Sequence, residues 1–137
     1  MNGRSRALAL RWFDEVWNRQ LAATVDELLA PDAVGHMEGV DVVGPGAFNE
    51  ARSALLVAFP DLRITVEDTV VEGENVVVRW RAAGTHLGEG FGIRATRTAV
   101  AFRGMTWQRI VDGRIVEGWD AWNQGALIES LRAAAEL

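Results

Sequence analysis

Apolar and polar positions follow two different periods along this chain, and the period changes near residue 62. Over residues 3–20 the apolar positions recur at helical spacing and form one stripe: Ala9, Trp12, Phe13, Val16 and Trp17. From residue 62 onward apolar and polar positions alternate, which is typical of β-strands with one buried face. The pattern therefore predicts N-terminal helices followed by a sheet.

Two more helices and one short strand are expected before residue 62. Residues 24–32 carry Thr24 and Glu27 at the spacing of a capping box, which predicts the start of a second helix. Residues 44–61 place Pro45 in a first helical turn and Pro60 at the end, which predicts a third. Between these helices, residues 33–38 are expected to form a brief strand.

The alternating region predicts four strands and a closing helix. Asp112 and Gly113 form a dipeptide that favours a two-residue hairpin turn. The expected order is an antiparallel meander and a final helix, over residues 62–73, 76–86, 98–111, 114–122 and 124–135. This order predicts an α+β domain of cone shape, in which helices cover one face of a curved, mostly antiparallel sheet and enclose a pocket.

Length and charge limit the classes of function. A chain of 137 residues is long enough for one domain with a core of its own, spanning residues 1–137. A net charge of −5 argues against nucleic acid or an anionic membrane as partner. No apolar run approaches the roughly 18 residues that span a bilayer, and the N-terminus lacks a complete signal peptide. A cytoplasmic location is therefore expected.

The residue types that are absent narrow the chemistry further. The sequence contains no Cys and no Tyr, and all 14 basic residues are Arg. Thiolate catalysis, lysine Schiff bases and cysteine-bound zinc are therefore excluded. Two histidines are too few for a usual multi-histidine metal site. An enzyme with this sequence would depend on Asp, Glu, His, Arg and the indole N–H group.

The segment EGWDAWNQ, residues 117–124, places Asp120 between two tryptophans. If the hairpin turn alone sets the register, Met105 lies opposite Asp120. Arg103 and Trp107 are then its diagonal neighbours, and Trp122 points to the same face. A one-residue bulge after the turn would shift this set by one position.

Asp120 has two possible roles in this arrangement. Apolar neighbours would raise the pKa of its carboxyl and Arg103 would lower it, as in a general acid or base. Alternatively, Asp120 is a surface residue paired with Arg103, a contact worth about 0–1 kcal/mol. The spacing alone leaves both roles open.

Several other side chains are candidate pocket residues. His36 either faces the mouth of the cavity or lies in a solvated turn. His86 continues the alternation that includes Trp80, and it either ends a row of pocket residues or begins the loop that follows. That loop contains GEGFGI, residues 88–93, which does not match a phosphate-binding motif. It is either a lid over the cavity or a plain connection between strands.

Three runs of the sequence resemble the SnoaL-like polyketide cyclases, which belong to the nuclear transport factor 2-like superfamily of α+β cone folds. The runs are AFPDLRITVEDTVVEGENVVVRW, GTHLGEGFGI and RIVDGRIVEGWDAWNQGALIESL. The similarity extends to WFDEVWNRQ and LLAPDAVGH near the N-terminus. The resemblance therefore covers nearly the whole chain.

The resemblance implies ring closure of a polyketide by intramolecular aldol condensation, without metal or cofactor. The aspartate that acts as acid and base in these cyclases matches Asp120. A histidine that assists it is replaced near Thr106 and Trp107, and Asn123 stands where many relatives have a second acid. The expected substrate is a hydrophobic, carbonyl-containing small molecule, with candidate contacts from Trp107, Trp122, Met105, Arg103, Trp80, His86 and His36.

Two other functions fit the same fold. One is a non-catalytic domain that binds a small ligand. The other is an epoxide hydrolase or hydratase with an Asp-Arg-Asp cluster, for which Arg103 and Asp120 would be joined by Asp68 or Glu67. Ketosteroid-isomerase-like sites need a tyrosine, which this chain lacks.

A homodimer or higher homo-oligomer is also expected. Relatives of this fold commonly associate through the exposed face of the sheet. Ile110 and Trp119 are expected on that face, where they would form an apolar surface.

Overall fold

The structure is a computed structural model that describes residues 2–137. Within these residues the chain forms three helices, two strands, a fourth helix, four strands and a final helix, in that order. The elements are α1 (Asn2–Arg11), the π-helix η1 (Trp12–Asn18), α2 (Ala22–Leu28), β1 (Leu29–Met37), β2 (Val40–Val43), α3 (Gly44–Ala58), β3 (Arg63–Glu72), β4 (Asn75–Thr85), β5 (Ala99–Val111), β6 (Arg114–Trp122) and α4 (Gln124–Ala135). The α+β class predicted from the sequence is confirmed.

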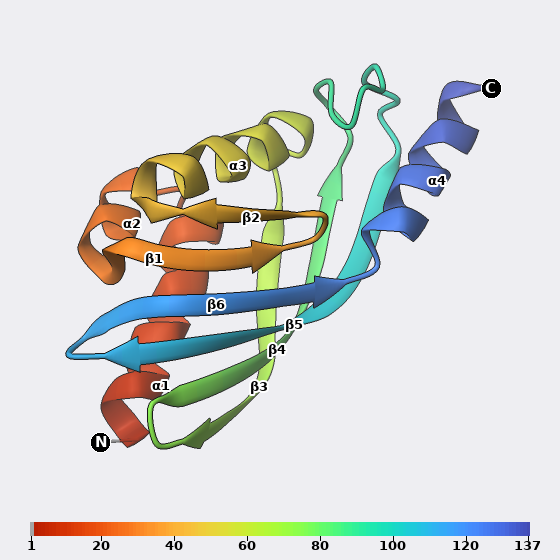
Figure 1. Cartoon of the computed structure of the whole chain (residues 1–137). Helices are drawn as coiled ribbons and strands as arrows, with labels where there is room; N and C mark the ends of the chain where they lie inside the picture. Colours follow the sequence, from red (N-terminus) through yellow and green to blue (C-terminus); the bar gives the residue numbers. More distant parts are fainter. Residues whose placement is uncertain (1) are drawn as a thin grey trace.

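The strands form one six-stranded sheet in the order β2-β1-β6-β5-β4-β3 (Figure 1). Strands β3 to β6 make the predicted antiparallel meander. Strand β1 adds to this meander by pairing in parallel with β6, and β2 folds back on β1 as a short antiparallel hairpin. The pairing of β1 with β6 joins residues about 80 positions apart, and local sequence patterns carry no information about it.

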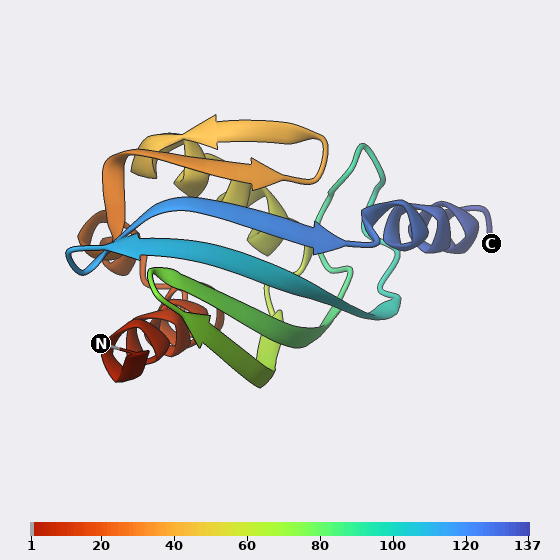
Figure 2. The ribbon, with the colours of Figure 1, turned by 60° about the horizontal axis from the view of Figure 1, so that its bottom comes forward.

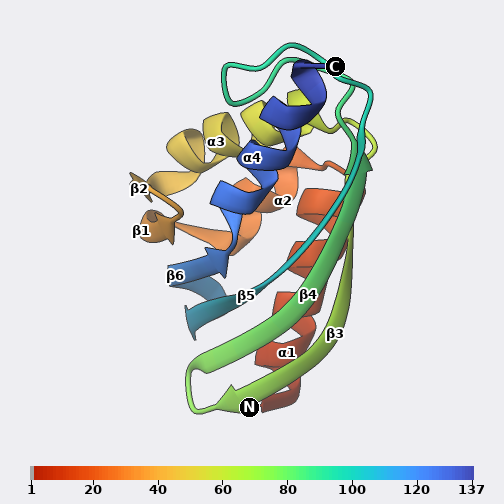
Figure 3. The same ribbon diagram turned by 90° about the vertical axis from the view of Figure 1, so that its right-hand side faces the viewer.

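Helices α1, α2 and α3 lie on one side of the sheet. Figure 2 shows the outer face of the sheet toward the viewer, with these helices behind it. The sheet curves around them in the side view of Figure 3, and α4 extends beyond the end of the sheet. The result is the predicted cone shape, with its interior between the curved sheet and the helices.

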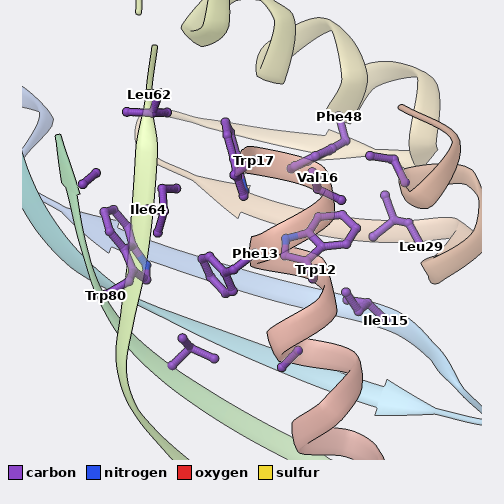
Figure 4. Close-up of a cluster of buried hydrophobic side chains, with 14 of the residues drawn as sticks. Trp12, Phe13, Val16, Trp17, Leu29, Phe48, Leu62, Ile64, Trp80 and Ile115 are labelled. Carbon is purple, nitrogen blue, oxygen red and sulfur yellow. The ribbon is translucent and has the colours of Figure 1, made fainter. Parts of the chain in front are cut away.

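The first predicted helix forms in two parts, because its second half widens into the π-helix η1. There the Arg19 N–H group donates to the carbonyl oxygen of Asp14, five residues earlier, at 2.8 Å. The side chain of Asn18 fixes this segment to β3: it accepts from the N–H group of Ile64 at 2.7 Å and donates to the carbonyl oxygen of Ile64 at 2.8 Å. Figure 4 shows the buried side chains that η1 contributes to the core: Trp12, Phe13, Val16 and Trp17.

The predicted capping box at the start of α2 is wrong. The residue at the helix N-terminus is Leu21, and no side chain caps the helix there. Thr24 lies inside the helix, is buried, and donates its hydroxyl hydrogen to Glu15 at 2.7 Å. Glu27 pairs instead with Arg11. Contacts with the preceding helix therefore override the local capping pattern.

The turn between β5 and β6 has the predicted geometry. Asp112 and Gly113 have φ angles of +51° and +77°, as a type I′ turn requires, and the turn pairs Val111 with Arg114. One step further, Ile110 pairs with Ile115. The beginning of the hairpin therefore follows the sequence-based expectation.

Beyond these pairs the register shifts by one residue. Arg109 pairs with Glu117, so Val116 is the extra residue of a β-bulge. As a consequence Asp120 lies opposite Thr106, whereas the uninterrupted register predicts Met105. This is the one-residue shift that the sequence analysis considered, and it decides which side chains surround Asp120.

No helix in residues 2–137 combines the length and apolar character needed to cross a membrane.

Gly104 occupies a position on the inner face of β5 that leaves no space for a side chain. A Cβ atom there would lie 2.7 Å from the side chains of both Trp80 and Trp122. We expect Gly104→Ala to lower the free energy of unfolding by about 1–3 kcal/mol, because the aromatic side chains must move. Chemical denaturation would measure the change.

Gly46→Ala is the matched control. Gly46 lies near the start of α3, and a Cβ atom there would meet nothing within 4 Å. We expect it to be neutral or to stabilise the protein by about 0.4–1 kcal/mol, because it restricts the unfolded chain. Equal effects of the two substitutions would contradict the close packing at Gly104.

Candidate functional site

A cavity of about 490 Å³ lies between the sheet and the helices. This volume is within the range of about 300–1,000 Å³ that small-molecule sites occupy. Its wall is mostly apolar and includes eight aromatic side chains from η1, α3, the sheet and the loop after β4: Trp12, Phe13, Trp17, Phe48, Trp80, Phe91, Phe102 and Trp122. Such a wall suits a flat, apolar ligand.

The inner face of the sheet presents three rows of residues to this cavity, each running across β4, β5 and β6. The first row is Trp80, Gly104 and Trp122; the second is Val78, Thr106 and Asp120; the third is Val76, Gln108 and Gly118. Neighbouring rows are two residues apart along each strand, or about 6.6–6.8 Å. Thr106 and Asp120 therefore lie in the second row and Gln108 in the third, one step further along the strands.

Asp120 is held in place by a directed chain of hydrogen bonds. The indole Nε1–H group of Trp80 donates to the Thr106 hydroxyl at 3.0 Å. An indole N–H group can only donate, so the hydroxyl accepts there and gives its own hydrogen to Oδ1 of Asp120, at 2.6 Å. The short distance is typical of a hydrogen bond to an ionised oxygen.

The pKa of Asp120 is raised above its ordinary value. Burial is the main cause, because the cavity wall solvates the charged carboxylate poorly. The Thr106 hydrogen bond acts in the opposite direction, and the negative charge of Glu38 raises the pKa further. Glu38 is positioned by the backbone N–H group of Trp122, which donates to its Oε1 at 3.0 Å. Asp120 is thus a carboxyl with a raised pKa in the wall of an apolar cavity.

Two of the predicted pocket tryptophans line the cavity together with Phe102. Trp122 stacks on Phe102, with ring centroids 4.8 Å apart and planes at 28°. Trp80 meets the same phenylalanine edge to face, at 6.1 Å and 85°. These three rings form an aromatic part of the cavity wall next to Asp120, in which only Phe102 and Trp122 are nearly parallel.

Three other predicted contacts lie on the opposite face of the sheet. Met105 and Trp107 are 52% and 48% exposed, and Arg103 is exposed beside them on β5. The indole N–H group of Trp107 donates to Asn75 at 2.8 Å instead of reaching the cavity. The bulge at Val116 causes this difference, because it turns the neighbours of Asp120 from odd to even positions of β5.

The Asp-Arg-Asp cluster of the epoxide-hydrolase alternative does not form. Arg103 and Asp120 lie on opposite faces of the sheet. Glu67 lies 3.8 Å from both Arg79 and Arg81 at the surface, and Asp68 is exposed. Within residues 2–137 no group of three His, Cys, Asp or Glu side chains is arranged to hold a metal ion.

His36 is not a cavity residue. Its ring stacks on Trp119 with a centroid distance of 5.4 Å. Its Nε2 contacts Glu117 at 2.7 Å and its Nδ1 contacts Asp41 at 3.0 Å. These two carboxylates, Glu117 first, raise the pKa of His36 above its ordinary value. His36 therefore belongs to a polar cluster on the outer face of the sheet.

His86 begins the loop that follows β4 and is fully buried. Its Nδ1 accepts from the Thr96 N–H group at 3.2 Å, and burial lowers its pKa. The side chain does not reach the cavity wall, but the loop does, through Gly90 and Phe91. This loop packs against the end of α3, where the N–H groups of Leu87 and Gly88 both donate to the Ala58 carbonyl oxygen.

The outer face of the sheet differs from the expectation in one residue. Trp119 is there, 39% exposed, and it meets Trp107 at a centroid distance of 6.1 Å. Ile110, expected beside it, is instead buried on the inner face. The bulge separates the two, since Ile110 pairs before the shift and Trp119 after it.

A scan of protein families matches residues 7–131 to the SnoaL-like polyketide cyclase family. The chain belongs to this family. Among curated proteins, no sequence matches significantly.

Several solved structures resemble this family member over nearly their whole length. One is a protein from Jannaschia sp. CCS1 that is named as a SnoaL-like polyketide cyclase. It has 26% identity and a TM-score of 0.91, with 96% of this chain and 94% of that chain covered. AclR from Streptomyces galilaeus, named as a hydroxylase, has 29% identity and a TM-score of 0.86 over 97% and 98% of the chains. IdmH from Streptomyces antibioticus, named as a polyketide cyclase, has 27% identity and a TM-score of 0.79 over 97% and 99%.

In this SnoaL-like protein, Thr106 stands opposite Asp120, in the region where the sequence comparison expected a replaced histidine. Asn123 has a structural role: its side chain caps α4 by accepting from the Ala126 N–H group at 3.0 Å. The sequence analysis missed Thr106, Gln108 and Glu38 as cavity residues. The signal that could have found the first two is the bulged register of β6, which brings Asp120 to the same face as the even positions of β5.

The pKa values of the two histidines should lie on opposite sides of the ordinary value of about 6.5. We expect the ring signals of His36 to change at higher pH, since two carboxylates stabilise its charged form. Those of His86 should change at lower pH, because burial disfavours its charge. Proton NMR across pH 4–9 would test this, with His36→Gln to assign the signals. Coincident titration of both rings would contradict the placement.

The same pKa shifts determine how the free energy of unfolding depends on pH. The folded protein binds the His36 proton more tightly than the unfolded chain, so this contribution is lost as pH rises above about 6.5. His86 acts oppositely, and its contribution is lost as pH falls below about 6.5. In unfolding measurements, His36→Gln should therefore remove part of the decline on the alkaline side only.

Thr106→Val should raise the pKa of Asp120 further, because it removes the hydrogen bond that favours the carboxylate. It should also lower the free energy of unfolding by about 1–3 kcal/mol, since the Trp80 N–H group loses its acceptor. Carboxyl ¹³C NMR and denaturation would measure the two effects. Thr106→Ser keeps the hydroxyl and serves as control; an unchanged Asp120 pKa in Thr106→Val would contradict the hydrogen-bond chain.

Proposed function

We propose that this protein catalyses a cofactor-independent acid/base reaction on a hydrophobic, carbonyl-containing small molecule, most concretely the cyclisation of a polyketide by intramolecular aldol condensation. The observation that carries the proposal is the Asp120 carboxyl, which has a raised pKa, lines an apolar cavity and is oriented by Thr106. Membership of the SnoaL-like family and the names of related structures support the substrate class.

The hydrogen bond from Thr106 assigns different tasks to the two carboxyl oxygens. Oδ1 accepts from the hydroxyl, so Oδ2 is the oxygen available to take a proton from the ligand. A hydrogen on a carbon between carbonyl groups is already acidic, and its removal leaves an enolate. A raised pKa makes the carboxylate a stronger base than an ordinary aspartate.

The aldol step balances with this one carboxyl. The C–H bond breaks as Oδ2 receives the proton, and the enolate carbon attacks a second carbonyl of the same molecule. A C–C bond forms and that carbonyl becomes an alkoxide. Asp120 then returns its proton to the alkoxide and is again ionised. The net reaction of this addition, the ring-closing stage of the condensation, is an isomerisation, and no other reactant is consumed.

The cavity wall supplies the remaining requirements. The stacked rings of Phe102 and Trp122 offer a flat surface on which a planar ligand can be held beside Asp120. A cavity that holds the enolate carbon and the second carbonyl in contact lowers the barrier, because the conformational entropy needed to bring them together is lost on binding and not in the reaction step. An apolar enclosure also excludes water, which would compete for the carboxylate.

Asp120→Asn tests the proposed base. Anthrone is a suitable probe, because it is a flat tricyclic ketone with an acidic methylene group, and the exchange of its methylene hydrogens for deuterium reports proton removal. We expect the wild type to accelerate this exchange and the variant to lose about 10²–10⁴-fold of the rate, the usual contribution of a positioned acid or base. Mass spectrometry would follow the exchange.

Anthrone affinity is the control for this variant, because an amide can still accept the Thr106 hydrogen bond and should leave binding intact. Asp120→Asn should also be at least as stable as the wild type at a pH above the pKa of Asp120, because it removes a poorly solvated charge. Full exchange activity in the variant would refute the proposal. Binding without accelerated exchange in the wild type would leave the protein as a small-ligand binding domain.

The rate should depend on pH in a defined direction. Because Asp120 must be ionised to act as base, exchange should increase as pH rises through its pKa, which lies above the ordinary value. Thr106→Val should move this increase to higher pH, since the pKa rises further. The pH profiles of wild type, Thr106→Val and Thr106→Ser would be compared, and identical profiles for the first two would contradict the role of Thr106.

A further inference from the structure

Gln108 is a buried amide in the cavity wall without a complete set of hydrogen bonds. Its side chain is 2% exposed and lines the cavity from the third row of the sheet. Its Oε1 atom is enclosed, and no group in residues 2–137 donates a hydrogen bond to it. A polar atom in this condition destabilises a protein, because the hydrogen bonds that it makes to water in the unfolded chain are lost.

The surroundings of Gln108 offer no structural reason for an amide. Its cross-strand neighbours are Val76, which is fully buried, and Gly118, which has no side chain. An apolar side chain of similar size would fill the same space. Thr106 is different: its hydroxyl both accepts and donates, so it is fully used by the protein. Of these two buried polar residues of β5, only Gln108 has a side chain whose hydrogen-bonding capacity the protein leaves partly unused.

We propose that the carboxamide of Gln108 binds an oxygen substituent of the ligand and is the second polar anchor of the cavity, next to Asp120. Its row lies one step from that of Asp120, about 6.6–6.8 Å along the strands. The ligand that fits is therefore a flat apolar molecule with an oxygen about one ring away from the carbon that faces Asp120. This assignment of a substrate class rests on the proposed function.

The chemistry of the amide fits a carbonyl that becomes an enolate. When Asp120 removes the proton from carbon, the electron pair moves to the carbonyl oxygen, which becomes negative. An N–H group of Gln108 donates to that oxygen throughout, and the amide itself neither gains nor loses a proton. Rotation of the carboxamide by half a turn presents its oxygen instead, so the same residue can accept from a hydroxyl substituent.

A matched pair of ligands tests the anchor. Anthrone carries the carbonyl oxygen, and 9,10-dihydroanthracene has the same three-ring carbon skeleton without it. Binding is measured from the fluorescence of the tryptophans in the cavity wall, among them Trp80 and Trp122. We expect the wild type to prefer anthrone, and Gln108→Met to weaken anthrone binding by about three- to tenfold, the range for one neutral hydrogen bond. The hydrocarbon should bind the variant as well as the wild type or better.

A second readout separates a ligand anchor from a structural residue. If Gln108 serves the ligand, the ligand-free Gln108→Met protein should unfold at the same or a higher temperature than the wild type, because an unsatisfied buried atom is removed. Gln108→Leu is the second variant, in case Met does not pack. Gln20→Met is the matched control, since Gln20 is exposed and lies outside the cavity lining, and it should leave the preference unchanged.

The outcomes are distinct from those of the Asp120 test. Retention of the full anthrone preference in both Gln108 variants, or a drop in unfolding temperature without loss of preference, would overturn the anchor. A wild type without preference, whether both probes bind or neither does, would overturn it too. Should Gln108 determine the preference while Asp120→Asn exchanges as fast as the wild type, the anchor stands and the proposed catalysis fails.

Discussion

One extra residue in β6 determines what the cavity contains. Ile115 and Asp120 are an odd number of positions apart, so in a regular strand they would point to opposite faces. The bulge at Val116 absorbs one residue, and both side chains point inward. Without it, either the hydrophobic end of the hairpin or the carboxyl would face solvent. The hydrophobic core and the polar site can share one strand only because of this irregularity.

The fold was largely predictable because it depends on patterns that repeat. Local sequence predicts each of these elements: the helical spacing in residues 3–20, the alternation after residue 62 and the Asp112-Gly113 turn. The site was less predictable because it depends on which face of its strand each residue points to. A bulge of one residue reverses the faces of all residues after it, and nothing in the sequence at Val116 indicates that a bulge forms there. Asp120, Trp80 and Trp122 lie in the cavity wall, whereas Met105, Trp107 and Arg103 lie on the opposite face of the sheet.

The polar groups of the cavity differ in how well the protein satisfies them. Thr106 is enclosed between a donor and an acceptor, and it transmits the position of the Trp80 ring to Asp120. The Asp120 carboxyl is poorly solvated, and both its burial and the negative charge of Glu38 raise its pKa. Gln108 keeps an atom without any partner among the described residues. The free energy of unfolding is therefore lower than it would be with an apolar wall of the same shape, as expected where residues serve a ligand.

The π-helix and the β-bulge have the same origin in geometry. Each is a regular element that holds one residue more than its hydrogen-bond pattern allows, and each borders the cavity: η1 through Trp12, Phe13 and Trp17, and β6 through Asp120. A change of chain length by one residue at either place would rotate the side chains that follow while the rest of the scaffold stays. Insertions and deletions, more than substitutions, are thus the events by which such a pocket can be given a new lining in evolution.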